Sequence, residues 1–249
     1  YWWPHSDQLK VEGNYANGLK EGSWRSWDGL GNPSTEYKYK NGKPVFHKKW
    51  DGTGRIISIY NDSLLRKWDS KGKLTHEEHY KEGVKTFRKY CSIEGILLYE
   101  KSYRNGLADG FEKSWWREEQ LKYEKGYKNG KEHGRHREWS SKGVLIKESN
   151  YKNGMPDGRF FECHSGWKHT PYKEDYFKDG VQDSISRGWY GDGILEYEKS
   201  YKEGKPEGLY RTWYWTGHKE YERIYDRGKL IHEIYFQKKG TANQANSGY

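Results

Sequence analysis

The chain has 249 residues, of which 33% are charged and 32% hydrophobic, and its mean hydropathy is −1.30. Such values are typical of disordered chains, but 13 Trp and 23 Tyr indicate a folded protein with a thin core of aromatic rings. The net charge of +9 favours acidic partners, the two cysteines are too few for a disulfide framework, and no apolar run is long enough for a transmembrane helix.

The N-terminal segment reads Tyr1-Trp2-Trp3-Pro4 and lacks a methionine. We interpret this start as a processed N-terminus, which favours the bacterial periplasm over the cytoplasm. Trp2 and Trp3 precede the first repeat and are expected to cap it.

A short phrase then recurs along the chain: an aromatic residue, two mostly polar residues and Gly. Its copies start between 20 and 26 residues apart, most often 24. The ten aromatic residues that open the copies are Tyr15, Tyr39, Tyr60, Tyr80, Tyr103, Tyr127, Tyr151, Phe177, Tyr201 and Tyr225. Internal repeats of this length indicate an array of stacked supersecondary units.

The rest of each unit is periodic too. A Trp follows many of the glycines by nine residues, a second Gly follows that Trp by four, and a Leu and a Glu come soon after. The Glu column comprises Glu36, Glu77, Glu100, Glu124, Glu148, Glu198 and Glu222. We expect it to form a solvated ladder with Lys and Arg of adjacent strands, because one Glu per repeat at one position does not make an isolated acid–base pair.

Apolar residues alternate with polar ones before each key Tyr, which predicts strands. Leu195, Tyr197 and Tyr201 share one parity, and Glu196 and Glu198 have the other. Asn-Gly and similar pairs bound each segment, and such pairs favour tight hairpin turns in which Gly has a positive φ. The fold class is therefore predicted to be all-β, with about ten tandem β-hairpins and no substantial helix.

The unit resembles the MORN repeat, in the variant with a Tyr-x-Asn-Gly-Lys-x-x-Gly centre. Tyr127 to Gly134 and Tyr201 to Gly208 carry this centre, and Gly208 to Gly217 fit the Trp-bearing half. The resemblance implies an elongated, curved antiparallel sheet. Arrays of this variant without another domain are similar to bacterial immunity proteins or antitoxins, which neutralise a toxin by direct binding.

Irregular stretches break the pattern around residues 54–95, 115–120 and 162–172. Cys91 and Cys163 stand where other units have the column Trp, so we expect both to be core substitutions. Aromatic residues and Arg are favoured anchors of protein interfaces. The predicted partner-binding residues are Trp115, Trp116, Arg117, His164, Trp167, Lys168, His169, Tyr172 and Trp215.

Three patterns suggest metal or catalytic chemistry, and each has an ordinary structural explanation. The two His of His76-Glu-Glu-His79 are three residues apart and would point to opposite faces of a strand. Cys163, His164 and His169 lie in an irregular loop and match no closed zinc site. The glycines punctuate turns and form no phosphate loop. We therefore expect no catalytic residue, no metal and no cofactor.

The array is expected to end with a capping strand at Leu230 to Phe236. Residues 1–240 are predicted to form one repeat array, and residues 241–249 a flexible tail.

These features predict a non-enzymatic immunity protein or antitoxin that binds a cognate toxin or effector protein with an acidic surface patch. The alternative is a scaffold or a binder of anionic membrane surfaces, motivated by basic charge and interfacial aromatics; interleaved Glu argues against it. Single-stranded nucleic-acid binding is not favoured, because it needs exposed rings that the repeat pattern buries.

Overall fold

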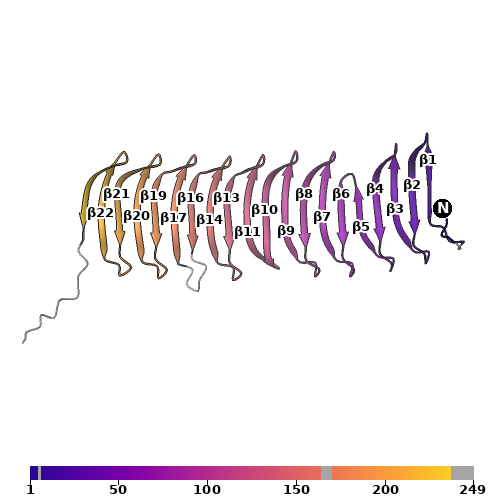
Figure 1. The fold of residues 1–249 in the computed structure, drawn as a ribbon, viewed down its shortest axis with the longest axis horizontal. Helices are drawn as coiled ribbons and strands as arrows, with labels where there is room; N and C mark the ends of the chain where they lie inside the picture. The colour runs from indigo at the N-terminus through magenta and orange to yellow at the C-terminus, as the bar shows by residue number, and fades with distance from the viewer. Residues whose placement is uncertain (5–6, 164–169, 237–249) are drawn as a thin grey trace, which may run out of the picture. The chain divides into compact units, whose positions relative to one another are not determined.

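The computed structural model describes residues 1–4, 7–163 and 170–236, which form β-strands joined by turns, with no helix among them (Figure 1). The chain divides into two compact units, Tyr1–Lys131 and Glu132–Tyr249. Within each unit, hairpin partners are antiparallel and strands lie side by side in chain order. The predicted fold class, an all-β antiparallel sheet of tandem hairpins, is confirmed.

The first unit contains eleven strands of five to eleven residues each. They are β1 (Val11–Ala16), β2 (Leu19–Trp27), β3 (Pro33–Lys40), β4 (Lys43–Trp50), β5 (Ile56–Asn61), β6 (Leu64–Trp68), β7 (Leu74–Lys81), β8 (Val84–Cys91), β9 (Leu97–Arg104), β10 (Leu107–Arg117) and β11 (Gln120–Lys128). The short strand β12 (Lys131–Glu132) falls at the boundary between the units.

The second unit repeats the same plan. Its strands are β13 (Gly134–Trp139), β14 (Leu145–Lys152), β15 (Met155–Pro156), β16 (Gly158–Cys163), β17 (Pro171–Lys178), β18 (Val181–Gln182), β19 (Ser184–Trp189), β20 (Leu195–Lys202), β21 (Lys205–Trp213), β22 (Lys219–Asp226) and β23 (Lys229–Tyr235). Asp157 separates β15 from β16, and its backbone N–H still donates to the Asn150 carbonyl of the neighbouring strand β14 at 2.9 Å.

The hairpin turns explain why this phrase recurs. In nine of them both central residues have a positive φ, as at Asn129 (50°) and Gly130 (80°). Two consecutive residues in this region make a type I′ turn, whose twist matches that of the flanking strands. The predicted positive φ of these glycines is confirmed, and the nine turns are those ending in Gly18, Gly42, Gly83, Gly106, Gly130, Gly154, Gly180, Gly204 and Gly228.

The connections at the other end of the strands use a different device. In five of them the residue after the column position folds its side chain back onto the turn: Asp51 Oδ1, for example, accepts from the backbone N–H groups of Thr53 at 2.8 Å and of Arg55 at 3.0 Å. Such Asx turns fix a loop without help from the rest of the protein. Asp28, Asp69, Ser92 and Ser140 make equivalent bonds.

Aromatic rings supply the apolar packing, as the composition predicts. Trp24, at 8% exposure, is the one buried hydrophobic residue in the described part of the chain. The backbone of Gly13 lies against the Trp24 indole. A Cβ at this position would come within 2.2 Å of the ring, so the contact requires glycine. In the second unit, the Phe160 ring centroid lies 5.3 Å from that of Tyr151 and 4.8 Å from that of Phe177. These contacts form the thin core of aromatic rings that the composition predicts.

The ends of the described chain fit the expected caps in part. Trp2 makes an antiparallel bridge with Leu9 ahead of β1, and the predicted final strand is β23. A single array over residues 1–240 stays a prediction, and the expected tail at 241–249 lies outside the described residues. The part of the chain that is described forms no helix that could span a membrane.

Candidate protein-binding surface

Strand alternation gives each unit two faces of different chemistry. In β20, Tyr197 points to one face and Glu198 to the other. We name these the aromatic face and the ladder face. In the first unit, the equivalent positions in β3 are those of Tyr37 on the aromatic face and Glu36 on the ladder face.

A continuous ion-pair ladder crosses the ladder face of the second unit. Neighbouring members lie 2.6 to 3.9 Å apart. They follow the order Arg135, Glu148, Arg159, Glu174, Arg187, Glu198, Arg211 and Glu222. The predicted pairing of the Glu column with Arg is confirmed here, but the expected solvation is not, because the side chains of Glu148 and Glu174 are 14% and 11% exposed. Glu174 joins the ladder although the inserted residues before it hid its place in the repeat.

Three arginines of this ladder, Arg159, Arg187 and Arg211, each join two carboxylates. Arg187 Nε donates to Glu198 at 2.8 Å, and its Nη1 lies 3.6 Å from Glu174. The hydrogen bond to Glu198 raises the pKa of Arg187 above its usual value. A guanidinium suits this role because its planar fork presents several fixed donors.

The ladder of the first unit is built more from lysine and is interrupted. Glu77 pairs with Arg66 at 2.6 Å and with Lys89 at 3.5 Å, and Lys113 pairs with Glu124 at 3.3 Å. Glu100 faces Lys89 and Lys113 in the strand register. Among the described residues it has no ion-pair partner, because each of these lysines is paired with another carboxylate.

Two adjacent carboxylates in β7 are buried on opposite faces. Burial alone raises the pKa of Glu77, but hydrogen bonds from His79 and Arg66 outweigh it and lower the pKa to about 2. Burial likewise raises the pKa of Glu78, but bonds from Lys85, Tyr80 and Arg88 lower it to about 2. These two glutamates are tied into the sheet as anions.

The His76-Glu-Glu-His79 motif is a packing element. The His76 ring lies 4.8 Å from Tyr90 on the aromatic face, and the His79 ring lies 5.4 Å from Phe87 on the ladder face. The predicted opposite orientation is confirmed. Over the described ranges, no group of three or more His, Cys, Asp or Glu residues is placed to hold a metal ion. His164 and His169 lie outside those ranges.

The column tryptophans are half-buried along the ladder face, in line with a packing role. Lys48 lies 4.9 Å from the ring centre of Trp50, and Arg137 lies 5.3 Å from that of Trp139. The seven column tryptophans are Trp27, Trp50, Trp68, Trp115, Trp139, Trp189 and Trp213. Cys91 takes the same place, is half-buried, and has a pKa raised by burial. Cys163 is also half-buried, and burial raises the pKa of its thiol.

Three of the predicted binding residues lie together at the end of β10, but they are not equally accessible. Trp115 is a half-buried column residue. Trp116 is 45% exposed and packs under Lys122, whose Nζ lies 4.6 Å from the ring centre. Arg117 is exposed, and its Nε donates to Gln120 at 2.7 Å.

The other predicted binding residues belong to the second unit. Tyr172 in β17 is 47% exposed, and Trp215, in the turn between β21 and β22, is 64% exposed. Both lie near the connections that follow the column Trp, as Trp116 does in the first unit. His164, Trp167, Lys168 and His169 lie outside the described residues.

The opposite ends of the strands carry a recurring bond that the sequence analysis missed. An acidic side chain near the start of one strand accepts a hydrogen bond from the first backbone N–H of the next hairpin turn. Asp183 Oδ2 accepts from Glu203 at 3.2 Å, and Glu207 accepts from Arg227 at 2.6 Å. We call this bond the turn latch. The latch acids are Glu21, Asp109, Asp157, Asp183 and Glu207, and His133 takes the place once.

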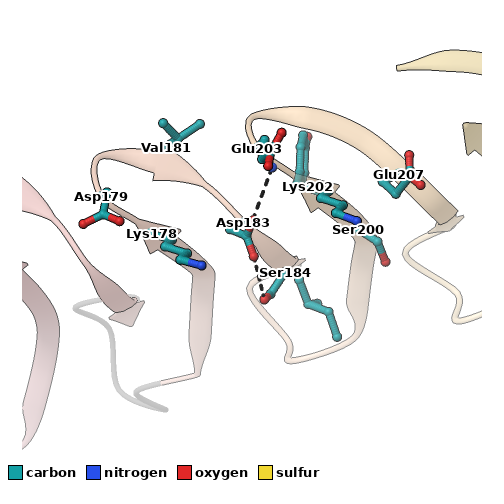
Figure 2. Close-up of a pocket in the computed structure, with 11 residues that line it drawn as sticks. Lys178, Asp179, Val181, Asp183, Ser184, Ser200, Lys202, Glu203 and Glu207 are labelled. Carbon is teal, nitrogen blue, oxygen red and sulfur yellow. Dashed lines mark hydrogen bonds between the residues drawn. The ribbon is translucent and has the colours of Figure 1, made fainter. Parts of the chain in front are cut away.

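Two of these turns flank an open hollow, whose lining residues are drawn in Figure 2. The volume of this hollow is about 640 Å³. Lys178, Val181 and Lys202 line it, together with Asp183, which is bonded to the Glu203 backbone. The hollow is the space between successive hairpin turns. Its lining combines lysines with carboxylates, of which Asp183 and Glu207 already accept the turn-latch hydrogen bonds.

Comparisons with known proteins leave the family open. No family model matches the chain, and no curated protein matches it. Among solved structures, the crystal structure of TcdB2-TccC3-Cdc42 is similar over 86% of this chain and 14% of that chain, with 9% identity and a TM-score of 0.22. This chain thus spans a small part of that one, and a likeness of this size carries no argument about function.

Proposed function

We propose that this chain is a non-enzymatic immunity protein or antitoxin that neutralises a bacterial toxin or effector by direct binding. The observation that carries the proposal is the exposure of its aromatic residues. Most rings of the described chain are half-buried, but Trp116, Tyr172 and Trp215 are 45%, 47% and 64% exposed, and large aromatic side chains dominate the energetics of protein interfaces.

The resemblance of the repeat to the MORN variant supports the narrower part of the proposal. Arrays of that variant are similar to immunity proteins. The column and turn positions are accounted for by packing, so we assign recognition to residues that leave the pattern, with Trp116 and Trp215 as the leading anchors.

Charge supports the expected partner. The net charge of +9 favours a toxin with an acidic patch, and long-range attraction of this kind accelerates encounter more than it strengthens the final complex. The association rate should therefore fall as salt rises.

The test is co-expression of the chain with the product of the neighbouring gene in a bacterial host. We expect growth to be rescued and the two proteins to co-purify. Trp215→Ala should weaken the complex by about 30-fold if the ring is a central anchor, since such residues contribute about 2 kcal/mol or more. Thr216→Ala is the matched control, because Thr216 is exposed in the same turn and carries no ring. Undiminished killing without co-purification overturns the proposal.

A further inference from the structure

The ladder face of the first unit has a hollow where one repeat lacks its tryptophan. The hollow is about 600 Å³, and its apolar lining includes Leu74, Phe87, Cys91 and Leu97. Between Trp27 and Trp50, where both column positions carry indoles, the corresponding hollow is about 280 Å³. The larger space thus coincides with the replacement of an indole by a thiol.

In the same place one carboxylate of the described ladder has no cation bonded to it, although Lys73, Lys89 and Glu94 also line the hollow. Glu100 lines the hollow and is the ladder carboxylate without an ion-pair partner among the described residues. Lys89 also lines it but pairs with Glu77 at 3.5 Å, and Lys73 donates to the Glu94 backbone carbonyl at 2.8 Å. Local charge complementarity therefore calls for a positive group beside Glu100, in contrast to the acidic patch expected for the partner as a whole.

We propose that this hollow is a subsite for an aromatic side chain of the partner protein, with a neighbouring cation of the partner bonded to Glu100. The occupant would supply the ring that other repeats carry at the position of Cys91. It would also supply a cation for Glu100, because Lys89 and Lys113 pair with other carboxylates. A half-buried carboxylate gains more from such a pair than an exposed one, because water screens it less. This subsite rests on the proposed protein-binding function and locates one of the contacts with the partner.

Tryptamine, an indole that carries an ammonium group, is a direct probe of the subsite in the isolated full-length chain. We expect saturable binding with a dissociation constant of about 1 mM, as is usual for a ligand of this size. Indole-3-propionate, which has the ring and a negative charge, should bind about tenfold more weakly. Hexylamine, which has the charge without the ring, should show no saturable binding up to about 10 mM.

Three variants locate the binding. Cys91→Trp fills the hollow with the residue that other repeats carry and should abolish tryptamine binding, whereas Cys163→Trp, the same exchange in the second unit, should leave it unchanged. Glu100→Gln should bring tryptamine and indole-3-propionate to similar affinities. Circular dichroism and thermal unfolding check that each variant is folded.

Absence of saturable tryptamine binding overturns the subsite, and so does binding that Cys91→Trp leaves intact. Equal affinity of the wild-type chain for tryptamine and indole-3-propionate also overturns it, because Glu100 would then have no part. These measurements need no toxin, so their failure is distinct from a failure of the co-expression test.

Discussion

The buried carboxylate of Glu78 offers the sharpest test of how the thin sheet is stabilised. Its side chain bonds to Lys85 at 2.6 Å, to Arg88 at 2.8 Å and to the Tyr80 hydroxyl. A fall in pKa from 4.5 to about 2 corresponds to about 3 kcal/mol of stability at neutral pH. Because the two cations are partly exposed, we expect Glu78→Gln to lower the free energy of unfolding by about 2 kcal/mol.

The sign of the pH dependence follows from the lowered pKa of Glu78. The carboxylate contributes fully above the unfolded pKa of 4.5, and its contribution is lost as the pH falls toward the folded pKa of about 2. The difference between wild type and Glu78→Gln should therefore be full at about pH 7 and less than half as large at about pH 3.

The assay is urea-induced unfolding followed by tryptophan fluorescence at both pH values. Glu82→Gln is the matched control, because Glu82 lies exposed in the turn of the same hairpin and the charge change is identical. If the two variants lose equal stability, or if the loss from Glu78→Gln does not shrink in acid, the buried anion is not what stabilises this hairpin.

Two further substitutions test the packing and the ladder of the second unit. Gly188→Ala should lower the free energy of unfolding by about 1–3 kcal/mol, measured by thermal unfolding, because the added Cβ would lie 2.3 Å from the Tyr197 ring. Gly191→Ala, which has open space around it, should lower it by less than about 1 kcal/mol. Equal losses from the two variants would refute the contact between Gly188 and Tyr197. Arg187→Ala should lower the free energy of unfolding by about 1 kcal/mol after allowance for solvent screening, and by less in high salt. Arg135→Ala should lower it by less than about 0.5 kcal/mol, because Arg135 is more exposed and lies 3.9 Å from its carboxylate. A larger loss from Arg135→Ala would show that the ladder is not what stabilises these strands.

The periodic features of the fold could be predicted from the sequence because each is a local property. A type I′ turn needs residues that tolerate positive φ, which Asn129 and Gly130 provide, and strand alternation fixes the face of Glu198 once Tyr197 is placed. The turn rule holds in nine of the ten copies, the copy that opens at Tyr60 being the exception, so these imperfect copies reinforce one another.

The features that the sequence did not reveal depend on which of several neighbouring side chains interact in three dimensions. Lys89 and Lys113 each have two carboxylates within reach of their strands, and only the three-dimensional positions show that both leave Glu100 unpaired. Glu174 was missed because inserted residues shift its distance from the preceding Gly. Trp115 and Trp116 differ in accessibility although both were predicted to bind a partner, because neighbouring residues of β10 point to opposite faces and only Trp115 lies in the packed column.

The turn latch has a consequence for how such an array changes over generations. The latch acid of one repeat bonds to a backbone N–H of the next, as Asp157 does to Asp179 at 3.2 Å, so the neighbour's side chain is irrelevant to the bond. Whole repeats can therefore be duplicated, deleted or exchanged by recombination without a matching change next door. An array of this kind can renew its irregular repeats while the bonds that join neighbouring repeats stay the same.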